Sequence, residues 1–277
     1  MYKILPFVVI TFLFVGCSEE QEETNLNNTG ELINEISNEL SLDTVSVDST
    51  ALSFGVNVNA LLEKADQEYQ LPFKIDSTFI SGFTGEAEDE YDLTAAEAKY
   101  LAINKLDNEI TDMAGYNIST FIKLDSIKNS GDWDDYQSTL DLGMARYSNG
   151  NVVGTVQIDE HLQILLWSID YATYEACPYG SGTYIFGTLF ALNHALNTCL
   201  LGEMSGGGDP PAWGDTRAYA EITSEMISIT SLDRSGEEDY DGMDFVDKRE
   251  FQYEISMSLD GFVVEKTEGG EWSGDNY

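Results

Sequence analysis

Three aspartates near the C-terminus have the spacing of oxygen ligands around a hard cation. Asp239, Asp241 and Asp244 alternate around Gly242 in the segment GEEDYDGMDFVD. Calcium takes about six to eight oxygen ligands, and a tight turn can deliver several of them. If the loop is counted from Glu237, its twelfth position is Lys248, where the EF-hand pattern requires a bidentate glutamate. A bound Ca²⁺ and a solvated acidic turn therefore both remain open.

Aromatic residues beside carboxylates form a second candidate site. Such rings can stack on sugars or hold a peptide segment, and GGGDPPAWGD is predicted to present its tryptophan at the surface. Core packing is the alternative for most of the tyrosines. Between Arg146 and Arg217 the chain has acids but no Lys or Arg, which favours a cationic or polyhydroxylated ligand. The candidate binding residues are Trp213, Asp209, Asp215, Trp167, Tyr171 and Tyr174.

Catalytic residues cannot be selected by spacing. The glycines of CPYGSGTYIFG do not match a dinucleotide loop, and Ser181 lacks the outer glycines of a nucleophile elbow. Hydrolysis by two carboxylates requires one acid with a raised pKa and a second at a defined separation. With 50 Asp and Glu in the chain, no pair stands out.

The N-terminal segment MYKILPFVVITFLFVGC resembles a bacterial lipoprotein signal. Lys3 precedes an apolar stretch over 4–15 that is too short to span a bilayer, and Gly16 precedes Cys17. The resemblance implies that residues 1–16 are removed, that Cys17 carries palmitate and other acyl chains, and that the membrane is reached through this anchor. The acidic run SEEQEE after Cys17 resembles the export signal of Bacteroidetes lipoproteins. It implies an outer-membrane protein that faces the cell exterior, with the periplasmic face as the alternative.

The cysteine count agrees with an extracytoplasmic location. Once the resemblance assigns Cys17 to lipid, Cys177 and Cys199 remain as a candidate disulfide, with two buried free thiols as the alternative. The two histidines lack the tight spacing of a structural zinc motif.

The charge of the chain limits its partners. A formal net charge of −37 excludes nucleic acid, because binding would require cations to replace the phosphate counterions. Carbohydrate and protein partners remain. A hydrophobic content of 42% is ample for a packed core.

The periodicity predicts an α+β fold in which an N-terminal helical cluster packs with a C-terminal antiparallel sheet. Residues 17–50 read as an acidic polar tether, 51–150 as the helical region and 151–277 as the β region. Helices are expected over 59–68, from the Thr94–Glu97 capping box to 113 with an end at Gly115, over 118–124 and over 132–147. Strands are expected over 152–158, 162–171, 183–191, 218–230 and 250–266, the last folded into a hairpin at Asp260-Gly261.

Three classes of function remain. The first is non-enzymatic binding of a polymer, a protein partner or calcium by a lipid-anchored surface protein. The second is a structural accessory subunit of an envelope complex, and the third is a carboxylate-based hydrolase.

Overall fold

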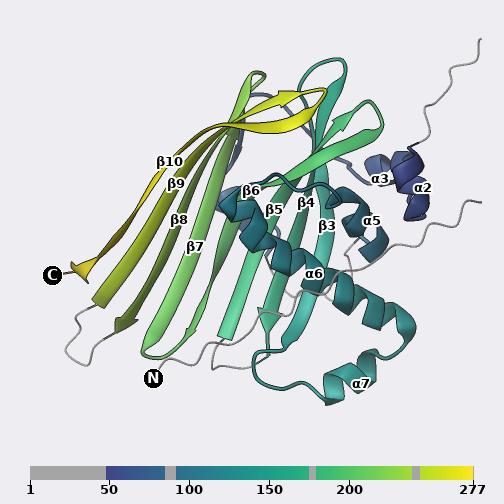
Figure 1. The fold of residues 1–277 in the computed structure, drawn as a ribbon. Coiled ribbons are helices and arrows are strands. Elements are labelled where there is room, and N and C mark those ends of the chain that lie inside the picture. Colours follow the sequence, from purple (N-terminus) through teal and green to yellow (C-terminus); the bar gives the residue numbers. More distant parts are fainter. Residues whose placement is uncertain (1–47, 85–91, 175–178, 239–243, 277) are drawn as a thin grey trace, which may run out of the picture. The chain divides into compact units, whose positions relative to one another are not determined.

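The computed structural model describes residues 48–84, 92–174, 179–238 and 244–276, all of which belong to one compact unit, 46–277. Most of this unit is one ten-stranded sheet (Figure 1). The helices are α2 (Ser49–Ser53), α3 (Val58–Glu63), α4 (Ser77–Ser81), α5 (Ala95–Leu101), α6 (Glu109–Ser130) and α7 (Trp133–Ser138). The short strands are β1 (Glu68–Tyr69) and β2 (Phe73–Ile75). The long strands are β3 (Ala145–Gln157), β4 (Leu162–Thr173), β5 (Tyr179–Ala191), β6 (His194–Asp209), β7 (Ala212–Ile222), β8 (Met226–Glu238), β9 (Asp244–Ser258) and β10 (Gly261–Asn276).

The long strands pair in sequence order, each antiparallel to the next, while β1 adds to β3 in parallel. The ladder is incomplete between β6 and β7, which pair only from Glu203 to Asp209. Beyond that point β2 pairs with the end of β7, where Phe73 lies opposite Ile222. The freed edge of β6 is covered by residues 104–106, because Thr198 donates to the Asn104 carbonyl and accepts from Leu106, both at 2.8 Å.

The start of β10 contacts β6 through the side chain of Asn197. The Asn197 amide accepts from the Phe262 backbone N–H at 2.8 Å and donates to the Phe262 carbonyl at 3.0 Å. Gly261 precedes it with a φ of +116°, and a Cβ there would lie 2.8 Å from Asn197 Oδ1. The ten-stranded sheet therefore curls so that its last strand contacts its middle.

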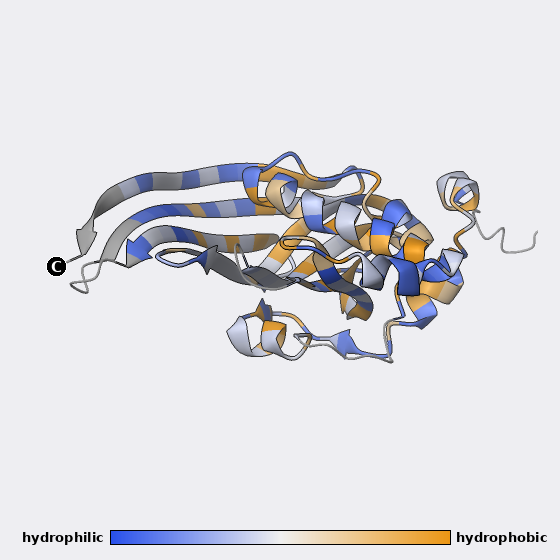
Figure 2. Cartoon of the chain, turned by 90° about the horizontal axis from the view of Figure 1, so that it is seen from below, coloured by the Kyte–Doolittle hydropathy of each residue, from blue (hydrophilic) through white to orange (hydrophobic). Residues whose placement is uncertain are grey.

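The core lies at the end of the sheet that helices cover on both faces. On one face Phe121 of α6 lies over Gly150, where a Cβ would be 2.8 Å from the ring. On the other face Ile75 and Ile80 pack over Gly202. Figure 2 shows apolar residues gathered beside the helices, whereas the coloured parts of β7–β10 that extend beyond the helices are mostly hydrophilic. The strands therefore extend beyond their apolar cover.

The α+β expectation holds in part: helices and a sheet are both present, but more of the chain is strand than the sequence predicts, and β1 makes the sheet mixed rather than antiparallel throughout. The Thr94–Glu97 capping box is present, but α5 ends at Leu101. A new helix begins after Asn108, whose side chain accepts from Thr111 N–H, and continues through Gly115 to the left-handed cap at Gly131. The prediction of one helix from Thr94 to Gly115 was therefore wrong, since residues 102–108 bend away to pair with β6.

The strand boundaries also differ from the expectations. The helix predicted over 132–147 ends at Ser138, and β3 begins at Ala145. The strand predicted over 218–230 is two strands, β7 and β8, joined at residues 223–225. The hairpin between β9 and β10 is confirmed, but Leu259 and Asp260 occupy its turn and Gly261 begins β10. Strand β6 was not predicted.

Cys199 is a free thiol, fully buried on β6 opposite Gly187. Its predicted disulfide partner, Cys177, lies outside the described residues. The first residue of β5, Tyr179, pairs with Gly208, nine residues along β6 from Cys199. That separation is roughly 30 Å along a strand, whereas the two Cα atoms of a disulfide lie within about 7 Å. Burial also raises the pKa of the Cys199 thiol, which suppresses its reactive thiolate form.

We expect iodoacetamide to leave Cys199 unmodified in the native protein and to alkylate it fully in denaturant without any reductant. Peptide mass mapping after non-reducing digestion measures both states. Recovery of a Cys177–Cys199 cross-linked peptide would contradict the free thiol of the structure and restore the expectation from the sequence.

Candidate functional site

Side chains of β7–β10 that point away from α6 form an accessible surface, which we call the open face. Its orientation follows from β9, where Arg249 pairs with Glu109 of α6 and Phe251 lies beside Ile110. Successive residues of a strand point to opposite faces, so the even-numbered residues of β9 point away from the helix. Directly paired residues on β7, β8 and β10 share that face.

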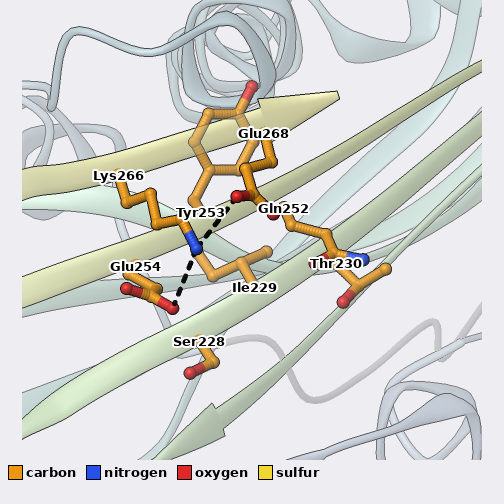
Figure 3. A pocket seen from close by; sticks show the side chains of 8 residues that line it. All are labelled: Ser228, Ile229, Thr230, Gln252, Tyr253, Glu254, Lys266 and Glu268. Atoms are coloured by element: carbon orange, nitrogen blue, oxygen red, sulfur yellow. Dashed lines mark ion pairs between the residues drawn. The ribbon is translucent and has the colours of Figure 1, made fainter. Parts of the chain in front are cut away.

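The middle of the open face contains a hollow of ≈170 Å³ (Figure 3). Lys266 Nζ lies between two carboxylates, 3.0 Å from Glu268 Oε1 and 3.8 Å from Glu254 Oε1. The hydrogen bond to Glu268 and the charge of Glu254 raise the pKa of Lys266. The side chains around the hollow supply hydroxyl, amide, carboxylate and ammonium groups: Ser228, Thr230, Gln252, Glu254, Lys266 and Glu268. Such a set can donate hydrogen bonds to a polar ligand and accept them from it.

A row of charged and aromatic residues crosses the open face nearer the end of the strands. The register places Asp215, Arg234, Lys248 and Trp272 side by side on β7, β8, β9 and β10. Arg234 binds Asp215 with two hydrogen bonds, Nε to Oδ1 at 2.9 Å and Nη2 to Oδ2 at 2.7 Å. That contact raises the pKa of Arg234. Arg217 Nε lies 3.0 Å from the same carboxylate, so two guanidinium groups neutralise one acid.

One tryptophan lies in this row and a second lies in the next row. Trp272 is 53% exposed, and its ring lies over Gly270, where a Cβ would be 3.4 Å from the indole. Trp213 is half-buried one row further along, between Gly208 and Gly236. Because both lateral neighbours of Trp213 lack side chains, the flanks of its ring are not covered by them. The two rings can therefore stack on a flat ligand.

The candidate binding residues from the sequence do not all converge. Trp213 and Asp215 lie together on the open face, and Asp209 is exposed at the end of β6. Trp167 is fully buried, where it donates from Nε1 to Thr188 Oγ1 at 2.9 Å and stacks on Phe186. Trp167 is therefore a core residue.

The two tyrosines of the prediction lie elsewhere. Tyr171 stacks on Tyr184, on the face that α6 covers, and burial raises its pKa. Tyr174 follows the end of β4 and donates from its backbone N–H to the Met144 carbonyl at 2.7 Å. Neither contributes to the open face.

The calcium prediction falls mainly on residues that the structure does not describe. Asp239 and Asp241 lie outside the described ranges, and Asp244 is the first residue of β9, opposite Glu238 and Asn276 in the ladder. Within the described part of the chain there is no group of three or more His, Cys, Asp or Glu placed to hold a metal ion. Calcium binding stays a prediction.

A second, narrow cleft, with room for about one water molecule, lies between α6 and the sheet. Glu203 is its most buried carboxylate, only 7% exposed, and it accepts a hydrogen bond from Ser205 Oγ at 2.5 Å. Burial raises the pKa of Glu203 to about 7, and the charge of Asp233 adds to this effect. Ile110, Met113 and Phe251 supply the apolar lining of the cleft. Glu203 therefore keeps its proton to a higher pH than an ordinary glutamate does.

Arg249 joins the rim of this cleft to α6. Its guanidinium pairs with Glu109 at the start of the helix, with Glu271 of β10 at 3.1 Å and with Asp233 of β8 at 3.9 Å. These partners come from three different elements. The ion pairs therefore fix the start of α6 on the sheet.

No protein-family model matches the chain, and comparison with curated proteins and with solved structures gives no match. Among the described residues, every helix is too short or too polar to span a membrane.

We expect Glu203→Gln to reduce the pH dependence of stability. The ordinary pKa of glutamate is 4.5, while folded Glu203 keeps its proton up to about pH 7. The stabilisation by protonated Glu203 is therefore complete below pH 4.5 and is lost as the pH rises to about 7. The variant should gain stability over the wild type across this window, by up to roughly 3 kcal/mol at roughly 1.4 kcal/mol per pH unit.

Urea unfolding at pH 4.5, 6 and 8 measures this difference. Glu225→Gln is the matched control, because Glu225 is exposed in the turn between β7 and β8. A constant difference between Glu203→Gln and the wild type at all three pH values would contradict the raised pKa.

Proposed function

We propose that the protein is a lipid-anchored binding protein of the outer membrane, displayed toward the cell exterior, that holds an extended carbohydrate polymer on its open face. The observation that carries the binding function is the pair Trp213 and Trp272 on the same face as a hollow lined by hydroxyl, amide and charged groups. Aromatic faces with convergent polar groups are the usual means by which proteins bind sugar rings. The Cys17 signal supports the location.

The shape of the open face supports a polymer rather than a small molecule. The hollow at Glu254 and the row at Lys248 are six residues apart on β9, which is roughly 20 Å along a strand. A small ligand can occupy one of these places but cannot span both. An extended chain that follows β9 and β10 can contact Trp272 and the hollow together.

We expect Trp272→Ala and Trp213→Ala each to weaken binding by roughly threefold to tenfold, the loss of one stacked ring. Affinity electrophoresis of the full chain in detergent, through gels that contain dextran, polygalacturonate or dextran sulfate, measures retention. Trp133→Ala is the control, because Trp133 lies on α7 beneath Lys128. If no gel retards the wild type, or if the control loses as much retention as the two variants, the open face is not the binding site.

The anchor has its own test. We expect Cys17→Ser to abolish incorporation of labelled palmitate and to release the protein from the membrane fraction. Protease added to intact cells should digest the wild-type protein. Protection of the wild-type protein, with digestion only after the outer membrane is opened, would place it on the periplasmic side.

Carboxylate-based hydrolysis is the second candidate, and Glu203 is the observation that favours it. A carboxylic acid with a pKa raised to about 7, in a cleft that Asp233 also lines, has the properties of a general acid. Glu203→Gln would then abolish turnover of a substrate that reaches the cleft beside α6, whereas Trp272→Ala, on the opposite face of the sheet, would leave that turnover unchanged. Unchanged turnover in Glu203→Gln would remove the hydrolase.

A further inference from the structure

We propose that the polymer held by the open face is an acidic polysaccharide, whose carboxylate or sulfate groups lie against Arg234 and Lys248 while its sugar rings stack on Trp272 and Trp213. This inference rests on the proposed function and names its ligand class.

The first support is the distribution of charge between the two faces. The whole chain has 13 Lys and Arg against 50 Asp and Glu. At the end of the open face, Arg217, Arg234 and Lys248 stand against Asp215 and Glu250, a local charge of +1. Two rows of the opposite face, at Arg249 and Asp247, carry one cation against three acids, a local charge of −2: Arg249 against Asp233, Asp247 and Glu271. The strongly acidic chain therefore has a small excess of cations in the two rows of the open face at Lys248 and Glu250.

Lys248 is the group best placed to meet an anion. Its side chain is exposed, and its neighbours across the sheet are Arg234 and Trp272. Within the described residues the structure records no ion pair for it. Arg234, by contrast, already holds Asp215 and presents only its remaining N–H groups. An acidic group on a ligand would thus complete the pairing of Lys248 and gain charge-assisted hydrogen bonds.

The net charge of the chain does not prevent this contact. At physiological ionic strength the Debye length is about 8 Å, so acids beyond that distance are largely screened from a ligand on the open face. Local charge then decides the sign of the interaction. We expect that raising the salt concentration above the physiological level weakens binding of an acidic polymer, because the added salt also screens the charge of Lys248.

A polysaccharide fits the open face better than an acidic peptide. Trp272 lies in the row of cations and Trp213 in the next row, so a ring that stacks on Trp272 has its acidic substituent beside Lys248. The hollow further along offers hydroxyl and amide groups for neutral hydroxyls of the same chain. A peptide of acidic residues would use the cations but would gain little from the flat aromatic faces.

The test compares polymers that differ only in charge. The full chain in detergent is titrated with polygalacturonate and with its fully methyl-esterified form, and with dextran sulfate and dextran, by isothermal calorimetry at 0.15 M salt. We expect the acidic member of at least one pair to bind about tenfold or more tightly than its neutral counterpart. Lys248→Gln should weaken the acidic polymer by about fivefold to tenfold and leave the neutral one unchanged. Lys99→Gln, at an exposed lysine on α5, is the matched control.

Each outcome separates the two proposals. Equal affinity within both pairs, with loss in Trp272→Ala, keeps carbohydrate binding and overturns the acidic ligand. If none of the four polymers binds, both are overturned. Poly-glutamate serves as a further probe. If it binds as tightly as the acidic polysaccharide, and Trp272→Ala weakens neither, the ligand class is an acidic polypeptide and the inference is wrong.

Discussion

The point at which β6 leaves β7 determines the rest of the structure. Backbone hydrogen bonds join the two strands only from Glu203 to Asp209, after which each finds another partner. The first half of β6 curves into the core with β5, while β7 takes β2 beside it. A continuous ladder would hold all the strands in one sheet under the same helices. Because it divides, one end of the molecule becomes a two-sided core and the other continues as a sheet without helical cover.

The uncovered part of the sheet uses the two-residue period of a strand to separate charges. Asp247 and Lys248 are neighbours in the chain, both exposed, yet they point to opposite faces. The face beside α6 carries the acids that Arg249 partly neutralises, and the open face carries Arg217, Arg234 and Lys248. A chain with a large net negative charge can thereby present a local surface with a small net positive charge.

The sequence predicts the individual helices and strands of this fold better than it predicts which of them lie side by side. The alternation in β9 and the capping box at Thr94 are local signals, and both are confirmed. The interruption at 102–108 depends on pairing with Thr198, about ninety residues away in the sequence, so no local pattern reveals it. For the same reason, the sequence does not reveal which residues of the open face lie side by side. Extending the hairpin from Gly261 opposite Ser258 would place Lys248 opposite residue 271, but a bulge between Val264 and Lys266 shifts the register to Trp272. Trp213 was recognisable as a surface aromatic, whereas its cationic neighbours come from β8 and β9.

The last strand has a consequence for how copies of the protein behave when crowded together. β10 ends the order of the sheet, so from Glu265 onward one of its edges offers unpaired N–H and C=O groups to another strand. Edges of this length invite one molecule to continue the sheet of the next. Along this edge Glu265, Glu268 and Glu271 outnumber Lys266, and all four are exposed. A second copy joining edge to edge would set carboxylate against carboxylate, so the charges along β10 oppose the pairing that would extend the sheet from one molecule to the next.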